Sequence, residues 1–125
     1  MAKVLLCDED LLFLRAMKDY LTLYGLEVNL IGQPRQVVPT LLQDSYGLFI
    51  CSRWMPTLDG VRLSESIRAS HDLKLQQLRI LLFAPEDVDM RERQYLRRLK
   101  VSMILKYHPV SRWVSQINTL LGTVG

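Results

Sequence analysis

The sequence holds little cysteine and no long hydrophobic run. Its 125 residues include 2 cysteines, 5 prolines and 6 glycines, and aromatic residues make up 8%. Two cysteines are too few for the disulfide framework of a small secreted domain, so both are expected to be reduced thiols. No apolar stretch approaches the ~20 residues that a membrane-spanning helix needs, and membrane contact is not expected. Acidic residues begin at position 8, too early for a secretory signal, which favours a cytoplasmic location.

The balance of apolar and charged residues is that of a folded protein. Hydrophobic residues account for 49% of the chain and charged residues for 23%, with a formal net charge of +3. This composition excludes an intrinsically disordered chain. The net charge is too small to imply nucleic-acid binding on its own. We expect a single domain over residues 1–125, because the length lies within the usual range for one domain.

Short apolar runs alternate with amphipathic segments along the chain. The near-continuous apolar character of these runs is typical of parallel strands covered on both faces. The runs are KVLLC (3–7), LEVNLI (26–31), GLFIC (47–51), RILLF (79–83) and SMILKY (102–107). Helical spacing of apolar residues predicts helices over 10–24, 61–69, 86–100 and 111–121. Five β-α units of this kind predict an α/β fold, a three-layer α/β/α sandwich with right-handed crossovers.

Capping residues and prolines place the ends of the predicted helices. Asp10 and Asp59 are expected N-caps, and Gly25 occupies the position of a glycine that ends a helix. Pro34 and Pro39 cannot both lie in the first turn of one helix, so the second helix should be short, starting near Pro39, or kinked. The buried face of the first helix is expected to contain Phe13, Met17, Tyr20, Leu21 and Tyr24.

The segment LFICSRWMPTLDG (48–60) is typical of a buried strand that runs into a loop and a new helix. It resembles the segment in which response-regulator receiver domains carry their phosphorylated aspartate, with Ser52 in the aspartate's place. The opening VLLCDED, the loop MPTLDG and the turn HPVS follow the same family pattern, and the resemblance covers essentially the whole chain. It implies a flavodoxin-like, five-stranded parallel sheet of order 2-1-3-4-5.

The resemblance also implies a degenerate phosphorylation pocket at the carboxyl edge of the sheet. In receivers an acidic pair and the acceptor aspartate hold Mg²⁺, while a hydroxyl residue and a lysine bind the phosphoryl oxygens. Asp8 and Glu9 match the acidic pair. The other positions are changed: Ser52 replaces the acceptor, Ala84 the hydroxyl residue, His108 the lysine and Leu105 the aromatic switch residue. We therefore expect that the phosphorelay chemistry is lost and that the protein is not an enzyme.

Several residues of this pocket allow two interpretations. Asp8 and Glu9 either cap the first helix or bind a metal ion weakly, so no cofactor is expected apart from weakly bound Mg²⁺. Ser52 is expected to be a hydrogen-bonded turn hydroxyl rather than a nucleophile. His108 is expected to point at the acidic pocket, either as a plain polar residue or as a pH switch. Arg53 either supplies the pocket with a permanent positive charge or points to solvent.

The two cysteines directly precede pocket residues on strands that the resemblance makes neighbours. Cys7 comes before Asp8, and Cys51 comes before Ser52. We expect the two side chains to lie close together as reduced core thiols, with redox sensing as a less favoured alternative.

The segment RERQYLRRLK (91–100) places Arg93, Arg97 and Lys100 on one side of a predicted helix. Basic residues near a helix C-terminus also complement its dipole, which is the purely structural interpretation. In receivers, however, the fourth helix, fifth strand and fifth helix form the usual output and dimerisation surface. A basic stripe there predicts an acidic protein partner, with Trp54 and Leu105 as further contact residues.

These observations predict a phosphorylation-independent, receiver-like module of bacterial two-component signalling that docks a protein partner; homodimerisation stays open. One alternative is a residual metal- or ligand-responsive switch that uses Asp8, Glu9 and His108. The other is a nucleic-acid-binding module that uses the basic helix, which is disfavoured because no reading-helix motif accompanies it. The family pattern also predicts a cis peptide bond between His108 and Pro109.

Overall fold

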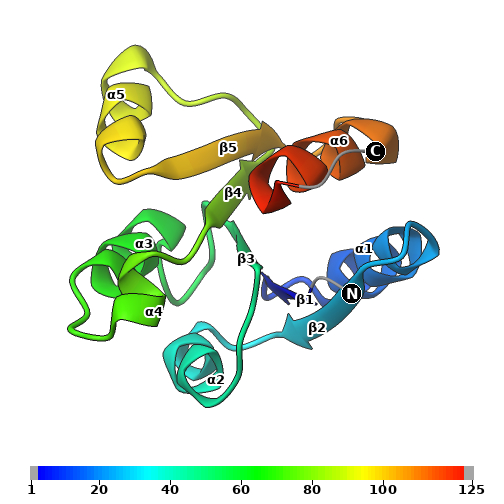
Figure 1. Ribbon diagram of the computed structural model, residues 1–125. Helices are drawn as coiled ribbons and strands as arrows, with labels where there is room; N and C mark the ends of the chain where they lie inside the picture. The colour runs from blue at the N-terminus through cyan, green and yellow to red at the C-terminus, as the bar shows by residue number, and fades with distance from the viewer. Residues whose placement is uncertain (1–2, 123–125) are drawn as a thin grey trace.

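The computed structural model describes residues 3–122. Its five strands form one parallel sheet in the order β2-β1-β3-β4-β5 (Figure 1). The strands are β1 (Lys3–Cys7), β2 (Glu27–Ile31), β3 (Leu48–Ser52), β4 (Ile80–Ala84) and β5 (Val101–Leu105). The predicted sheet order is confirmed, and each strand lies within a residue or two of its predicted position.

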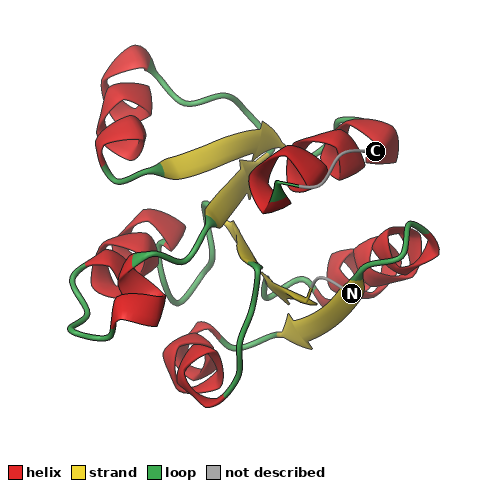
Figure 2. Ribbon diagram, in the orientation of Figure 1, coloured by secondary structure: helices red, strands yellow, loops and turns green. Residues whose placement is uncertain are grey.

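Helices cover both faces of the sheet and complete the predicted three-layer sandwich (Figure 2). They are α1 (Leu11–Leu23), a 3-10 turn (Pro34–Gln36), α2 (Val37–Gln43), α3 (Gly60–Arg68), α4 (Leu73–Gln76), α5 (Met90–Arg98) and α6 (Val110–Leu121). Apolar residues of α1 and α6 pack on one face of the sheet, and those of α2, α3, α4 and α5 pack on the other. Among the described helices, none combines the length and the hydrophobicity that a membrane crossing requires.

Successive side chains of the central strands point to opposite faces of the sheet and contribute to the apolar core on each face. In β3, Leu48 and Ile50 face the α1/α6 layer, whereas Phe49 and Cys51 face the α2–α5 layer. All five residues of β3 and all five of β4 are buried. Strands buried on both faces need apolar residues at every position, which is why the sequence shows continuous apolar runs there.

The predicted buried face of α1 is partly wrong. Its buried residues are Leu14, Met17 and Leu21, whereas Tyr20 and Tyr24 are exposed. Apolar side chains occur on all sides of this helix, so their spacing alone cannot fix its rotation about its axis. The predicted ends are confirmed: Asp10 accepts a hydrogen bond from the Phe13 N–H at 3.2 Å, and Gly25 has φ +85°.

The structure adds detail to the predicted second helix and contains a fourth helix that the sequence pattern does not predict. A 3-10 turn at Pro34 leads directly into α2, and Pro39 lies in the first turn of α2, where its missing N–H has no helical acceptor to lose. The second helix is therefore short, as predicted, and begins at Val37. The four-residue helix α4 was not predicted; Asp72 caps it by accepting hydrogen bonds from the Lys74 and Leu75 N–H groups.

The predicted cis peptide bond before Pro109 is wrong, because residues 3–122 contain no cis peptide. Pro109 instead precedes α6 with φ −55° and ψ 150°. The trans form of an X–Pro bond is intrinsically favoured by about 0.5–1 kcal/mol. The preceding turn is closed by the His108 N–H, which donates to the Leu105 carbonyl at 3.2 Å.

Candidate functional site

The carboxyl edge of the sheet brings Asp8, Ser52 and Ala84 together at the ends of β1, β3 and β4. Asp8 is 6% exposed and Ser52 is 7% exposed. The Ser52 hydroxyl donates to the Trp54 carbonyl at 2.8 Å. This bond turns the hydroxyl into the β3–α3 loop, as expected for a turn residue. Ala84 is buried and offers no hydroxyl to this edge.

The carboxylates of Asp8 and Glu9 both accept hydrogen bonds from neighbouring groups of the chain. The Asp8 carboxylate accepts from the Glu9 N–H at 2.8 Å, and the Glu9 carboxylate accepts from the Thr57 N–H at 3.2 Å and from the Thr57 hydroxyl. Glu9 thereby ties the start of α1 to the β3–α3 loop. The N-cap of α1 is Asp10, so the interpretation of Asp8 and Glu9 as its caps is wrong.

The donor set fits a divalent cation poorly. Mg²⁺ prefers several oxygen ligands in a near-octahedral arrangement. This edge offers two carboxylates, those of Asp8 and Glu9. The Glu9 carboxylate already accepts hydrogen bonds from the Thr57 N–H and hydroxyl. Within residues 3–122, no three His, Cys, Asp or Glu side chains form a group that could hold a metal ion. Ser52 stands where receivers have the acceptor aspartate, and its hydroxyl is already bonded to the Trp54 carbonyl.

Lys106 places a positive charge beside Asp8. Its backbone N–H donates to the Ala84 carbonyl at 2.7 Å, directly after β5. Its ammonium lies 3.9 Å from an Asp10 carboxylate oxygen and 4.5 Å from the centre of the Phe13 ring. The position directly before the proline of the turn favours His108 as the replacement of the family lysine and gives Lys106, two residues earlier, no need to reach the site, which the structure contradicts. The signal that identifies Lys106 is its position immediately after the last strand.

Burial dominates the electrostatics of Asp8. Desolvation raises the pKa of the Asp8 carboxyl above its ordinary value, although the Glu9 N–H and the Lys106 ammonium both act to lower it. The folded state therefore binds the Asp8 proton more tightly than the unfolded state does. That contribution to stability is present at low pH and is lost as the pH rises through the folded-state pKa.

Asp8→Asn is accordingly expected to raise the free energy of unfolding at neutral pH. The gain over wild type should shrink as the pH falls through the folded-state pKa of Asp8, because the wild-type carboxyl then becomes neutral as well. Urea denaturation across mildly acidic to neutral pH measures this difference. Glu86→Gln, at an exposed position, is the control. A pH-independent gain would contradict the assignment.

Arg53 adopts neither of its predicted positions. It is 7% exposed, and its guanidinium pairs with Asp59 at 2.5 Å and with Glu92 of α5. Its central carbon lies 3.8 Å from the centre of the Trp54 ring, which is 62% exposed. The cation therefore connects the β3–α3 loop to α5 and supports an exposed indole, instead of neutralising Asp8 and Glu9.

The two cysteines are neighbours, as predicted. Cys7 pairs with Cys51 in the register of β1 and β3, and both are buried free thiols. Their mutual hydrogen bond and burial raise the pKa of the Cys51 thiol well above its ordinary value. A protonated, buried thiol is a poor nucleophile, which favours the structural interpretation of this pair.

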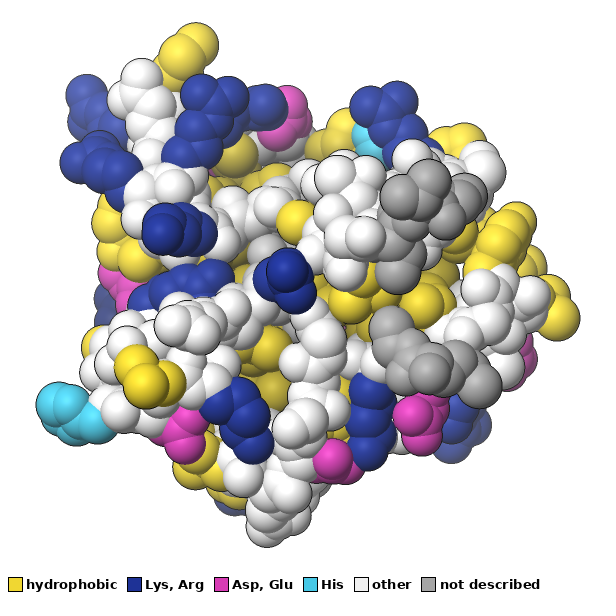
Figure 3. Space-filling view, in the orientation of Figure 1, with side chains coloured by type: hydrophobic (Ala, Val, Ile, Leu, Met, Phe, Trp, Pro, Cys, Tyr) yellow, Lys and Arg dark blue, Asp and Glu magenta, His cyan; other side chains and the backbone are white. Residues whose placement is uncertain are grey.

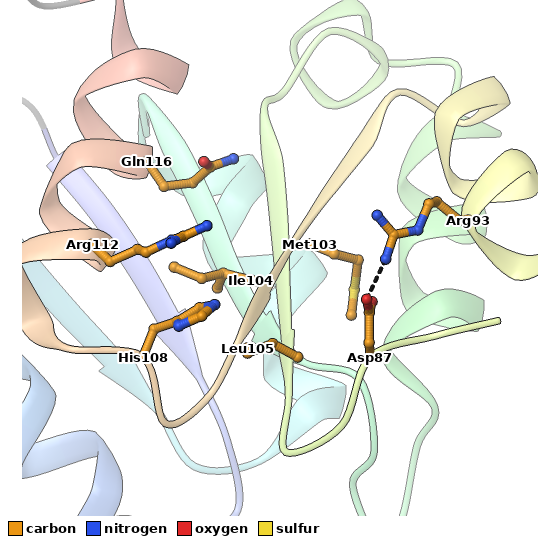
Figure 4. A pocket seen from close by; sticks show the side chains of 8 residues that line it. All are labelled: Asp87, Arg93, Met103, Ile104, Leu105, His108, Arg112 and Gln116. Atoms are coloured by element: carbon orange, nitrogen blue, oxygen red, sulfur yellow. Dashed lines mark hydrogen bonds and ion pairs between the residues drawn. The ribbon is translucent and has the colours of Figure 1, made fainter. Parts of the chain in front are cut away.

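A hollow of about 390 Å³ lies on the face formed by α5, β5 and α6 (Figure 4). Its lining comprises Asp87, Arg93, Met103, Ile104, Leu105, His108, Arg112 and Gln116. Arg93 is paired with Asp87 on the α5 side. His108 lies beside Arg112 in this hollow (Figure 4), so the prediction that it points at the acidic pocket is wrong. The cause is the turn at 106–108, which carries the chain away from the sheet edge before α6 begins.

The predicted basic stripe is divided between two places. Arg97 lines a second hollow of about 250 Å³ beside the first, together with Arg93, and Lys and Arg side chains gather over α5 (Figure 3). Lys100 instead lies in the α5–β5 turn with φ +58°, where its carbonyl accepts from Arg68 at 3.0 Å. Its predicted place in one stripe with Arg93 and Arg97 is therefore not observed.

Comparison with known proteins agrees with this geometry. The family model of the response regulator receiver domain matches residues 4–117 of this chain. Chemotaxis protein CheY4 of Vibrio cholerae superimposes with a TM-score of 0.86 at 17% identity, covering 96% of this chain and 98% of that one. A response regulator receiver protein from Pseudomonas putida superimposes with a TM-score of 0.83 at 23% identity, covering 94% of this chain and 96% of that one. No curated protein sequence matches the chain significantly.

Proposed function

The chain belongs to the response regulator receiver domain family, and we propose that it is a phosphorylation-independent member that docks a protein partner through its α5–β5–α6 face. Receiver domains act in two-component signalling. In this proposal the protein is not an enzyme, works in the cytoplasm and needs no resident cofactor. Its docking conformation is present without a phosphoryl group.

Independence from phosphorylation is supported by the side chains at the sheet edge. Ser52 carries a hydroxyl bonded to a backbone carbonyl in place of an acceptor carboxylate. Ala84 cannot donate to a phosphoryl oxygen. Within the acidic pair, the Glu9 carboxylate is already bonded to the Thr57 N–H and hydroxyl. A phosphoryl group bound here would lack both its attachment point and an oriented hydroxyl donor.

The α5–β5–α6 hollow is the observation that carries the docking proposal. Its floor is apolar, formed by Met103, Ile104 and Leu105. On its α6 side, Arg112 and Gln116 are one helical turn apart, and neither makes a side-chain hydrogen bond or an ion pair within the described part of the chain. A segment with one apolar side chain for the floor and a carboxylate for Arg112 would complement this surface.

The test is a docking measurement on charge-reversed protein. The wild-type chain serves as bait to capture and identify the partner, and the dissociation constant is then measured for Arg97→Glu/Arg112→Glu. We expect affinity to fall by tenfold or more, about 1.4 kcal/mol, because both changes repel an acidic partner. Arg93 is left intact since its removal would free the paired Asp87.

The matched control is Arg62→Glu, a charge reversal at an exposed position of α3. Exposed substitutions usually change stability by only about 0.5 kcal/mol, so all variants should remain folded. Equal binding by the double variant and by the control would contradict docking through this face.

The two alternative functions gain no support from the geometry. The switch hypothesis requires His108 beside Asp8 and Glu9, but His108 lines the α5–β5–α6 hollow. The nucleic-acid hypothesis requires several free basic residues along α5; Arg93 is paired with Asp87, and no reading-helix motif accompanies the others. Titration with Mg²⁺ and salt-dependent binding to DNA remain the measurements that test them.

A further inference from the structure

The outer face of α1 exposes large apolar side chains that no contact within residues 3–122 covers. Leu12 and Leu23 are each 81% exposed, and Leu11 and Tyr20 of the same helix, with Tyr24 directly after it, are about half exposed. Hydrophobic side chains protrude at the edge of the molecule where α1 lies (Figure 3). Single exposed apolar residues are ordinary, but a contiguous group of them marks an interaction surface.

Leu12 and Leu23, the most exposed large apolar residues of α1, share one helical stripe with the exposed Ala16 and Asp19. Leu12, Ala16, Asp19 and Leu23 are separated by four, three and four residues, and we call this set the outer seam of α1. Residues at these intervals form one stripe along a helix. The stripe lies opposite the buried residues Leu14, Met17 and Leu21. Ala16 is small enough to let a second helix approach closely.

The charges on the exposed side of α1 are complementary between two copies, because Asp19 lies in the outer seam and Arg15 lies beside it. Arg15 and Asp19 form no ion pair within the described residues. When two copies of α1 run antiparallel about a two-fold axis that passes between Ala16 and Asp19 of the outer seam, Arg15 of each copy lies opposite Asp19 of the other. Leu12 and Leu23 then meet at both ends of the contact. A parallel arrangement would bring Arg15 against Arg15 and Asp19 against Asp19, which is repulsive.

We propose that two copies of this chain associate by antiparallel packing of the outer seams of α1. Such a contact is isologous, so the same patch serves both copies. It involves a part of the molecule distant from α5 (Figure 1), and it leaves the α5–β5–α6 hollow of each copy available. One helix pair buries less area than the standard interface of about 1,600 Å², so the association is weak and strongly dependent on concentration.

Sedimentation equilibrium over micromolar to millimolar protein tests the association. Wild type is expected to shift from monomer to dimer, and Leu12→Glu/Leu23→Glu to remain monomeric throughout. Leu73→Glu, at a position of α4 that is 67% exposed, is the matched control and should dimerise like wild type. A wild type that stays monomeric, or a control that loses dimerisation equally, would overturn the proposal.

Charge exchange tests the antiparallel orientation. Arg15→Asp and Asp19→Arg are each expected to weaken dimerisation tenfold or more, because each creates like charges across the axis. The double variant Arg15→Asp/Asp19→Arg restores opposite charges and should recover wild-type association. Circular dichroism confirms that each variant keeps its helices. Failure of the double variant to recover would overturn the antiparallel arrangement, and these outcomes do not depend on docking at the hollow.

Discussion

Arg53→Met is expected to lower the free energy of unfolding by about 3 kcal/mol, the lower end of the range for breaking a buried ion pair by removing one partner. The Arg53 guanidinium is buried and holds two carboxylates at once, those of Asp59 and Glu92. Its loss leaves both without their cation. The estimate stays at the lower end because the Asp59 and Glu92 side chains are 29% and 23% exposed, so water can solvate them in part.

Denaturation by urea measures this loss, and Arg62→Met at an exposed position of α3 is the control. The control should stay within about 0.5 kcal/mol of wild type. Adding Glu92→Gln to Arg53→Met is expected to recover part of the stability, because it removes one of the two carboxylates left without a cation. A loss no larger than that of the control would show that the ion pairs contribute nothing.

The location of this ion-pair group gives it a consequence for docking. Asp59 caps α3, whereas Glu92 lies in the first turn of α5, so Arg53 joins two helices on the same side of the sheet. The connection runs through one buried guanidinium. Arg53→Met should therefore speed amide hydrogen exchange in the first turn of α5 more than in β4.

The strands and caps could be predicted because their causes are local. Strand β4 is covered on both faces, so its burial requires the apolar run that the sequence shows. Asp10 and Asp59 cap helices through bonds to N–H groups two or three residues away. Both signals are complete within a few positions of the chain.

The orientation of side chains in the pocket could not be predicted, since it depends on residues distant in sequence. The sequence pattern allows Arg53 to face Asp8 or solvent, but its acceptor Glu92 comes from a helix 39 positions later. The position of His108 beside Pro109 favours it as the pocket residue, but the turn after β5 directs Lys106 toward the acidic residues instead. The pattern also predicts that Tyr20 of α1 is buried, but Tyr20 is exposed, because apolar residues on either side of this helix fit the same spacing.

Ser52→Asp alone is expected to remain almost unlabelled by acetyl phosphate and Mg²⁺, whereas Ser52→Asp/Ala84→Thr is expected to become phosphorylated. In the labelling step, a carboxylate oxygen at position 52 attacks phosphorus, the bond from phosphorus to the acetyl oxygen breaks, and acetate leaves. The new carboxylate joins Asp8 and Glu9 at the sheet edge and supplies the missing oxygen ligand for Mg²⁺. The single variant still lacks a hydroxyl donor at position 84 for the phosphoryl oxygens, and oriented donors supply much of the catalysis in phosphoryl transfer.

The position of Lys106 makes a further lysine unnecessary for phosphorylation of the double variant. Because its ammonium already lies at the acidic edge, the double variant should label without His108→Lys, and adding that change should have no effect. Lys106→Met in the double variant should reduce labelling on the order of 10²-fold, the typical loss for one oriented charge or donor. Intact-protein mass spectrometry reads the outcome. Labelling of the wild type would contradict phosphorylation independence. A double variant that labels only after His108→Lys is added would show that Lys106 does not serve as the pocket lysine.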